Sequence, residues 1–383
     1  MTGATDSKRR FTAVLAAGGT GGHMFPAQAL ARVLLERGAK VVLITDKRGA
    51  GFGPDLPQIE TWRVSAGGVA GGDLLSRASG ALRLGWGILQ ARSLLKRIGP
   101  DSVVGFGGYA SVPTVFAAGR LGLRVILHEQ NAVAGRANRL LAPKAETICT
   151  SFATVSGLRD SEQEKVTITG NPVRSAIAQL GRQPYGVPGP NDEFRLLVIG
   201  GSQGARVFND VLPHALCRLP DAIKARLKVA QQVRGTDTGS VSEVYDTCGV
   251  TAELRPFFED MSERLRAAHL LICRAGASTV AELAAAGRPA ILVPYPFAAD
   301  DHQTGNAQAL AEAGGGWLLP QSNLTPHSLA ERLVRLIEEP GALVQAAGCA
   351  RAFAEENAAE RLADVVLNHT RSNGGAKREE AAA

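Results

Sequence analysis

Four glycines and a histidine stand close together at residues 16–23, in the sequence AAGGTGGH. A turn of this kind, between an apolar strand and a helix, leaves backbone N–H groups free at the helix start, where the helix dipole favours anions. Glycine has no Cβ, so a phosphate can come close to the main chain. His23 follows, and imidazole exchanges a proton near neutral pH. The segment therefore predicts an anion site beside a candidate general base.

Further turns of this kind follow apolar runs at residues 105–111 (GFGGYAS) and 200–206 (GGSQGAR), and a fourth junction of strand and helix lies at 273–287 (CRAGASTVAELAAAG). Any one of these turns could serve only to pack a helix tightly onto a sheet. Because they occur in both halves of the chain, they favour two anion sites that face each other across one cleft.

Apolar runs alternate with helical patterns along the chain, and the runs are typical of buried parallel strands. These strands and helices must position the glycine turns. The runs are FTAVLAA, KVVLITD, SVVGFGG, RVILHEQ and ETICTS, followed by RLLVIGG, LKVAQQV, LLICRAG and PAILVPY. We expect an α/β protein with two Rossmann-like, doubly wound domains, residues 8–178 and 194–350, facing each other across a cleft. The Pro- and Gly-rich residues 179–193 are the expected linker. A long amphipathic helix follows residue 346, and the tail 371–383 is expected to be disordered.

The composition argues against several other classes of protein. The 42 basic and 36 acidic residues give a net charge of +6, which suits a phosphate-bearing ligand or an anionic membrane but is too small to indicate nucleic acid. The five cysteines are scattered without a CxxC pair, so we expect neither a disulfide framework nor a zinc site. No apolar stretch reaches the roughly 18 residues of a membrane span.

Dinucleotide binding is the main alternative that the glycine turns leave open. GGTGG and GGSQG lack the G-x-G-x-x-G spacing, and Asp46 lies farther beyond Gly18 than the roughly 20 residues expected of a ribose-binding acid. An NAD(P)-dependent oxidoreductase therefore fits less well, and a non-catalytic nucleotide-sugar-binding or scaffolding protein is a third possibility.

An ordered set of motifs closely resembles the MurG family of bacterial glycosyltransferases. The motifs are GGTGGHMFPAQALA, GFGGYASVP, HEQNAVAGRANRLLA, GNPVR, GGSQGARVFN, FFEDM and RAGASTVAELAAAGRPAILVPYP with DDHQTGNA. The resemblance implies a GT-B fold whose last helix, at about 352–370, packs back on the N-terminal domain. It also implies an inverting transfer of GlcNAc from UDP-GlcNAc to the MurNAc C4 hydroxyl of lipid I (undecaprenyl-pyrophosphoryl-MurNAc-pentapeptide), which forms lipid II in peptidoglycan synthesis. A sterol or macrolide glycosyltransferase is the nearest alternative.

The resemblance also assigns residues to UDP-GlcNAc, most of them in the C-terminal domain. They are Thr20, Gly21, Gly22, Asn131, Arg174, Ser202, Phe258, Ala277, Ser278, Thr279, Val280, Ala281, Glu282 and Gln303. Glu282 would accept from the ribose hydroxyls, Phe258 would meet uracil through its backbone, and Gln303 would bind the sugar. Each has a simpler alternative: Glu282, Gln303 and Arg174 could be surface side chains, Asn131 a helix cap and Phe258 part of the core.

The acceptor and the base are assigned to the N-terminal domain. His23 is the preferred catalytic base and Glu129 its rival. The acceptor pyrophosphate is expected at Gly18, Gly19, Gly107, Gly108 and Tyr109. No DxD motif is present, so we expect no metal ion and no other cofactor, and helix starts would stabilise the departing UDP.

Residues 73–97 combine apolar side chains with five basic residues and one acidic residue. This composition suits an anionic membrane surface, although an ordinary core helix with a basic face is the alternative. The resemblance implies a peripheral protein on the cytoplasmic face of the bacterial inner membrane, with other cell-wall and division proteins as partners.

Overall fold

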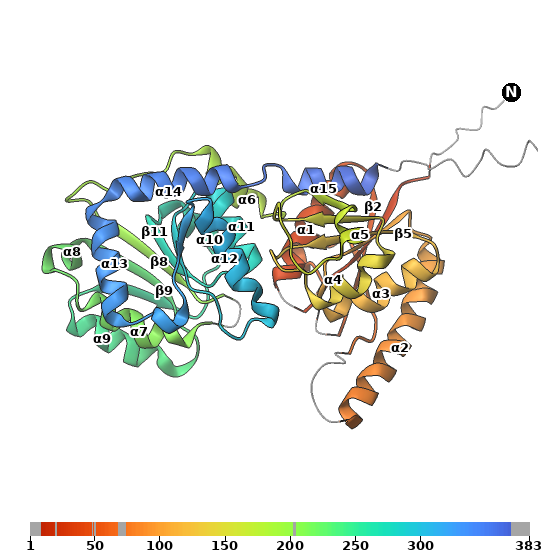
Figure 1. Cartoon of the computed structure of the whole chain (residues 1–383), viewed down its shortest axis with the longest axis horizontal. Helices are drawn as coiled ribbons and strands as arrows, with labels where there is room; N and C mark the ends of the chain where they lie inside the picture. The colour runs from red at the N-terminus through yellow and green to blue at the C-terminus, as the bar shows by residue number, and fades with distance from the viewer. Residues whose placement is uncertain are drawn as a thin grey trace, which may run out of the picture.

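Two parallel sheets with helices packed around them form the two halves of the molecule (Figure 1). The computed structural model describes residues 9–19, 21–47, 49, 51–67, 74–201 and 204–368. Within them the N-terminal sheet has seven strands in the order β3-β2-β1-β4-β5-β6-β7, and the C-terminal sheet has six in the order β10-β9-β8-β11-β12-β13. The predicted α/β class and two doubly wound domains are confirmed.

The strands are short, and the central ones are apolar, as buried parallel strands must be. The outer strands β3, β7 and β10 are partly exposed. In chain order they are β1 Thr12–Ala16, β2 Lys40–Thr45, β3 Glu60–Arg63, β4 Ser102–Gly105, β5 Arg124–Glu129, β6 Thr147–Thr150, β7 Val166–Ile168, β8 Phe194–Ile199, β9 Leu227–Gln232, β10 Thr251–Arg255, β11 Leu270–Cys273, β12 Ala290–Leu292 and β13 Gly316–Leu318. Along each strand, successive side chains point to opposite faces of the sheet. Leu15 packs in the core on one face with Leu30 and Leu34, whereas Val14 packs on the other with Val103 and Val115.

Helices connect successive strands. The helices of the N-terminal half are α1 Gly21–Glu36, α2 Leu74–Ile98, α3 Gly108–Arg120, α4 Arg136–Leu141, α5 Asp160–Gln163 and α6 Ser175–Ala178. Those that follow are α7 Arg206–Leu216, α8 Asp221–Arg226, α9 Thr238–Thr247, α10 Met261–Ala267, α11 Ala277–Ala286, α12 His302–Glu312, α13 Pro326–Glu338, α14 Pro340–Phe353 and α15 Ala358–Leu367. Short 3₁₀ turns are η1 Gly53–Asp55, η2 Ala142–Lys144, η3 Gln179–Arg182, η4 Gly235–Asp237, η5 Ala299–Asp301 and η6 Gln321–Asn323.

The strand order reverses direction once in each sheet, between β1 and β4 and between β8 and β11. Ligands of open α/β sheets bind in the crevice at such points, beyond the carboxyl ends of the strands. The glycine turns predicted from the sequence follow β1, β4, β8 and β11, so they lie at these two points.

The C-terminal end of the chain differs from the single long helix that the sequence predicts. α14 ends at Phe353, and a new helix, α15, begins at Ala358 after Asn357 with a φ of 56°. This break lets α15 lie over the N-terminal domain (Figure 1), where Leu362 and Val366 join the core around β1 and α1. The tail 371–383 lies outside the described residues.

The boundary at residues 179–193 stays a prediction, but the first part of this segment packs tightly. Leu180 and Gly181 are buried in η3, and the Tyr185 hydroxyl donates to the carbonyl of His269 at 2.7 Å. The segment is therefore fixed to the C-terminal domain rather than free in solvent.

Cys217 and Cys248, at the ends of α7 and α9, form a disulfide, which contradicts the expectation of no disulfide framework. The two residues are 31 apart in sequence and meet only because their helices pack side by side, so spacing alone gives no sign of the pair. In the described part of the chain no helix is long and apolar enough to span a bilayer.

Candidate active site between the two sheets

The starts of α1 and α11 meet across the boundary between the two domains. The Ser278 hydroxyl donates to the carbonyl of Gly22 at 3.5 Å. The residue before α11, Gly276, has no side chain to cap the helix, so Ser278 and Thr279 do not act as the N-cap that their types suggest. Two helix starts with backbone N–H groups available therefore face one another, an arrangement suited to a diphosphate.

His23, in the first turn of α1, lies beside the second glycine turn. Its Nδ1 is 3.2 Å from Oε1 of Gln130, and its Nε2 lies 3.2 Å from the position that a Cβ on Gly108 would occupy. Burial lowers the pKa of the His23 imidazole, although Glu129 and the hydrogen bond to Gln130 oppose this effect. A lowered pKa keeps the ring neutral near pH 7, as a proton acceptor requires.

Glu129, the rival base, is 1% exposed at the end of β5. Its Oε1 accepts from the backbone and side-chain nitrogens of Asn131, at 2.9 and 3.2 Å. Its Oε2 accepts from the backbone of Gly135 at 2.9 Å and from Asn138 Nδ2 at 2.8 Å. These four bonds shape the loop after β5, and they leave Glu129 poorly placed to reach a substrate.

Arg174 and Glu282 join the two domains near the facing helix starts. Nε and Nη2 of Arg174 both donate to Oε1 of Glu282, at 3.0 and 2.9 Å, and the guanidinium lies 5.4 Å from the ring centroid of Phe25. Burial raises the pKa of Glu282, and the charge of Arg174 opposes the rise. Both residues were predicted from the motifs, but the ion pair between them was not.

Asn306, in α12, links the domains and was missed from the sequence. It is fully buried, and its Oδ1 accepts from the backbone of Ala132 at 2.8 Å. Its Nδ2 donates to Asn131 Oδ1 at 3.1 Å and to the carbonyl of Ala275 at 3.0 Å. The predicted residue Asn131 therefore acts in this structure as part of the domain contact, and it does not cap a helix. Asn306 stands in the motif DDHQTGNA, but the sequence gives no sign of its partners in the N-terminal domain.

Gln303, one turn earlier in α12, fixes two loops. Its Oε1 accepts from the backbone of Ala275 at 3.2 Å and of Tyr295 at 3.0 Å. The amide nitrogen is the group of Gln303 that remains for a ligand such as a sugar hydroxyl.

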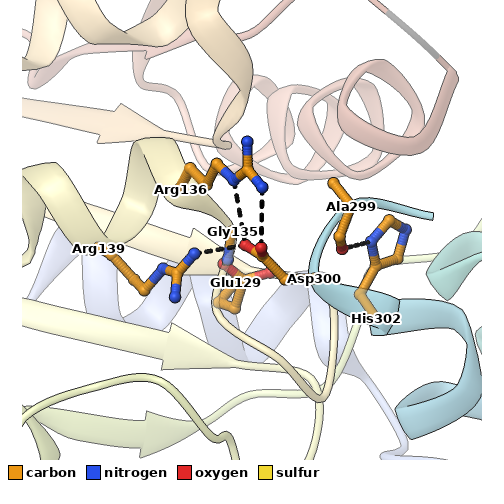
Figure 2. A network of polar contacts seen from close by, with 7 residues as sticks. All are labelled: Glu129, Gly135, Arg136, Arg139, Ala299, Asp300 and His302. Atoms are coloured by element: carbon orange, nitrogen blue, oxygen red, sulfur yellow. Dashed lines mark hydrogen bonds and ion pairs between the residues drawn. The ribbon is translucent and has the colours of Figure 1, made fainter. Parts of the chain in front are cut away.

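Asp300 reaches from the turn before α12 to two arginines of the N-terminal domain (Figure 2). Arg136 donates to it through Nη2 at 3.0 Å, and Arg139 makes a second ion pair. The bond from Arg136 holds the pKa of the Asp300 carboxyl below its usual range. His302 lies nearby and donates through Nδ1 to the carbonyl of Ala299 at 2.7 Å. This acidic segment thus binds arginines across the domain boundary.

The glycines assigned to the acceptor pyrophosphate have different surroundings. A Cβ on Gly18 would lie 2.7 Å from both Ala110 and Thr45, so glycine is required there for packing. Gly107 and Gly108 have φ values of 82° and 70°, which favour glycine, and they line the space beside His23. Tyr109 is partly exposed beside them.

The surroundings of the other predicted residues say less about their roles. Phe258 is 3% exposed in the core, with the guanidinium of Arg264 4.1 Å from its ring centroid. Thr20 and Ser202 lie outside the described residues. The remaining assigned residues, Gly19, Gly21, Gly22, Ala277, Thr279, Val280 and Ala281, lie in the turn after β1 or in the first turns of α1 and α11.

Two of the cavities formed by the described residues bear on where a ligand could lie. One of about 40 Å³ lies between the domains, beside Asn171 and Ala281. The other, about 340 Å³, is lined by Arg195, Lys228 and Thr251 at the amino ends of β8, β9 and β10. The larger one is thus at the sheet edge opposite the glycine turns, and we do not assign the chemistry to it. Among the described residues no cluster of three His, Cys, Asp or Glu side chains could hold a metal ion.

Comparison with known proteins gives matches over both domains. The N-terminal domain model of glycosyltransferase family 28 matches residues 13–150, and the C-terminal domain model matches residues 195–362. A protein of Paramagnetospirillum magneticum, named UDP-N-acetylglucosamine--N-acetylmuramyl-(pentapeptide) pyrophosphoryl-undecaprenol N-acetylglucosamine transferase, is 54% identical over 94% of this chain and 98% of its own length. The protein of that name from Rhodospirillum rubrum is 55% identical over 92% of this chain and 90% of its own. The crystal structure of Acinetobacter baumannii MurG matches with a TM-score of 0.74 at 32% identity, over 93% of this chain and 99% of that one.

Proposed function

The chain belongs to glycosyltransferase family 28, and from this premise we propose how the site between its two domains performs the transfer. The enzyme is a UDP-GlcNAc-dependent glycosyltransferase of the MurG type with a GT-B fold. It moves GlcNAc to the MurNAc C4 hydroxyl of lipid I and so forms lipid II for peptidoglycan synthesis. The facing starts of α1 and α11 are the observation that carries the assignment of the site.

The donor binds to the C-terminal domain in this proposal. Backbone N–H groups at the start of α11 hold the diphosphate. Both bonds from Arg174 go to Oε1 of Glu282, so Oε2 is the oxygen available to the ribose hydroxyls. The contact between Ser278 and Gly22 marks where the two domains must separate to admit the diphosphate.

The acceptor binds to the N-terminal domain beside His23. Inverting transfer needs a base for the acceptor hydroxyl and a positive potential for the departing nucleotide. His23 Nε2 takes the proton of the C4 hydroxyl while the hydroxyl oxygen bonds to the anomeric carbon of GlcNAc. The bond from that carbon to the UDP oxygen breaks, and UDP leaves with the electron pair. The bonds that engage both oxygens of Glu129 favour His23 over Glu129 as the base.

A transfer assay tests this function and the role of His23 together. Radiolabelled UDP-GlcNAc is incubated with a soluble lipid I analogue, and label in the lipid fraction is measured. We expect transfer by the unmodified chain and a roughly 100- to 10,000-fold lower kcat for His23→Ala, with little change in the KM for UDP-GlcNAc. His327→Ala, which alters an exposed histidine of α13, is the matched control. Turnover of His23→Ala near that of the control would rule out the base role.

The partner surface in this proposal is an anionic membrane, at the cytoplasmic face of the inner membrane where lipid I is held. α2 extends away from the body of the N-terminal domain (Figure 1). Leu84, Ile88 and Ala91 pack on the domain core, while Leu82, Trp86 and Leu89 are exposed along another stripe of the helix. Core packing alone does not explain this exposed apolar stripe, and the basic side chains of α2 suit anionic headgroups. The predicted segment 73–97 also contains Leu74 and Leu75, whose side chains lie outside the described residues.

A further inference from the structure

Three side chains form a chain of hydrogen bonds that ends at the proposed base. His128, at 0% exposure in β5, has its Nε2 3.0 Å from the carbonyl oxygen of Gly170 and its Nδ1 3.0 Å from Nε2 of Gln130. Gln130, at 1% exposure, has its Oε1 3.2 Å from Nδ1 of His23. The chain therefore runs from Gly170 through two fully buried side chains to His23.

The donors and acceptors in this chain follow from elementary chemistry, because its far end is a carbonyl that can only accept. Nε2 of His128 must carry a hydrogen to donate to Gly170, so Nδ1 of the neutral ring is the acceptor. Gln130 Nε2 donates to that nitrogen, and it also lies 3.0 Å from the carbonyl oxygen of Phe106 and 3.1 Å from that of His128. Because these atoms can only accept, the amide group of Gln130 is oriented with its nitrogen toward His128 and Phe106.

The amide oxygen of Gln130 is then the atom that faces His23, and an amide oxygen only accepts. Nδ1 of His23 must therefore carry the hydrogen, and Nε2 must carry the lone pair. We propose that His128 and Gln130 are positioning residues that hold His23 in the Nδ1–H tautomer, with Nε2 directed past Gly108 as the proton acceptor. The proposal deepens the function above, since it rests on His23 being the base.

The surroundings keep this chain in a single state. Burial lowers the pKa of His128 to about 4, so its ring stays neutral and Nδ1 remains an acceptor at neutral pH. The charged and titratable groups that act on His23 are Glu129 at the end of β5 and His302 at the start of α12, together with His128 itself. Glu129 cannot replace Gln130, because its oxygens accept from the loop after β5.

The direct test is the tautomer of His23 in the unmodified full chain. Long-range ¹H–¹⁵N NMR spectra of protein labelled with ¹⁵N-histidine distinguish the two neutral tautomers, and the spectrum of His23→Ala assigns the signals. At pH 8 we expect Nδ1 protonated and Nε2 bare in His23, and the opposite in His128. A His23 ring protonated at Nε2, or averaged between tautomers, overturns the proposal.

A matched pair of substitutions tests the effect on catalysis. His128→Asn keeps an acceptor at the position of Nδ1, whereas His128→Gln keeps a donor at the position of Nε2 but no acceptor for Gln130. We expect His128→Gln to lower kcat by roughly tenfold or more at an unchanged KM for UDP-GlcNAc, and His128→Asn to retain most of the activity. Equal losses in the two variants, or a larger loss in His128→Asn, overturn the positioning role.

The two possible failures are distinguishable. If His23 has the Nδ1–H tautomer but His23→Ala retains full kcat, the base role fails while the hydrogen-bond chain stands. If His23→Ala is inactive but the tautomer is Nε2–H, His23 is needed for turnover, and the proposed positioning of its Nε2 lone pair by His128 and Gln130 is wrong.

Discussion

Replacing the exposed apolar stripe of α2 should release the enzyme from membranes without changing its chemistry. The variant is Leu82→Ser, Trp86→Ser and Leu89→Ser combined. These side chains are 77%, 60% and 58% exposed, so their removal takes little packing from the fold. Spacings of four and three residues place all three on one stripe of the helix.

The size of the effect follows from the exposed fractions. Burying a whole Leu side chain is worth about 2 kcal/mol, and Trp has a larger area. At the exposures observed, complete transfer of the three side chains into an apolar phase would contribute about 5 kcal/mol. Insertion to half that extent contributes about 2.5 kcal/mol, which corresponds to a change of roughly 50- to 100-fold in the partition constant. Each nearby Lys or Arg adds about 1 kcal/mol on an anionic surface at low salt.

Flotation with vesicles that contain anionic phospholipid measures the partition constant. Val344→Ser, which alters a 45% exposed side chain on α14, is the control for loss of a surface apolar group. We expect binding of the α2 variant to be roughly 50- to 100-fold weaker, and binding of the control and kcat on a soluble acceptor to be unchanged. Equal flotation of the α2 variant and the control would refute the assignment of α2 to the membrane.

Three further predictions concern the packing and the buried polar groups. Gly87→Ala should destabilise the fold by about 2 kcal/mol because its Cβ would lie 1.8 Å from the carbonyl oxygen of Ser65. Gly85→Ala, whose Cβ would have no described atom outside its own helix turn within 4 Å, should stabilise the fold by up to about 1 kcal/mol. Urea denaturation compares the two, and equal effects would contradict the packing of α2. The pKa of His128 is about 4 in the folded protein and 6.5 in an unfolded chain, so the unfolded chain takes up the proton first as the pH falls. The free energy of unfolding should therefore fall by about 3 kcal/mol between pH 6.5 and 4, relative to His128→Asn. Parallel pH profiles of the two proteins would contradict this. Asn306→Ala should lose about 3 kcal/mol of stability to urea because it leaves its three hydrogen-bond partners unpaired, and a loss below about 0.5 kcal/mol would show that the contact between the domains is weak.

The sequence predicts best those features for which local geometry or burial requires one type of residue. Buried parallel strands need apolar runs, and turns with positive φ need glycine, so the central strands and the turns around Gly107 and Gly108 could be predicted. The outer strands β3, β7, β10 and β13 have no such run and were missed. The reason that one particular position requires glycine could not be predicted. Gly18 is needed because Ala110 and Thr45 occupy the space of its Cβ, and those residues come close only in the folded sheet.

Contacts between the domains were harder to predict, because they depend on how two separately folded units meet. Asn306 makes its bonds to a loop that lies far away in the sequence, and nothing in its own helix indicates them. The pairing of Arg174 with Glu282 is of the same kind. The break before α15 depends on one residue, Asn357, in the left-handed region, which periodicity over a long helical pattern does not detect.

The central claim is that the donor lies at the meeting point of α1 and α11, between Glu282 and His23. A crystal structure of the complex with UDP-GlcNAc tests it most directly. The account predicts ribose hydroxyls within hydrogen-bond distance of Glu282 Oε2, the diphosphate at the start of α11, and the anomeric carbon on the side of His23. A nucleotide bound instead in the cavity at the amino ends of β8, β9 and β10, beside Arg195, would contradict it.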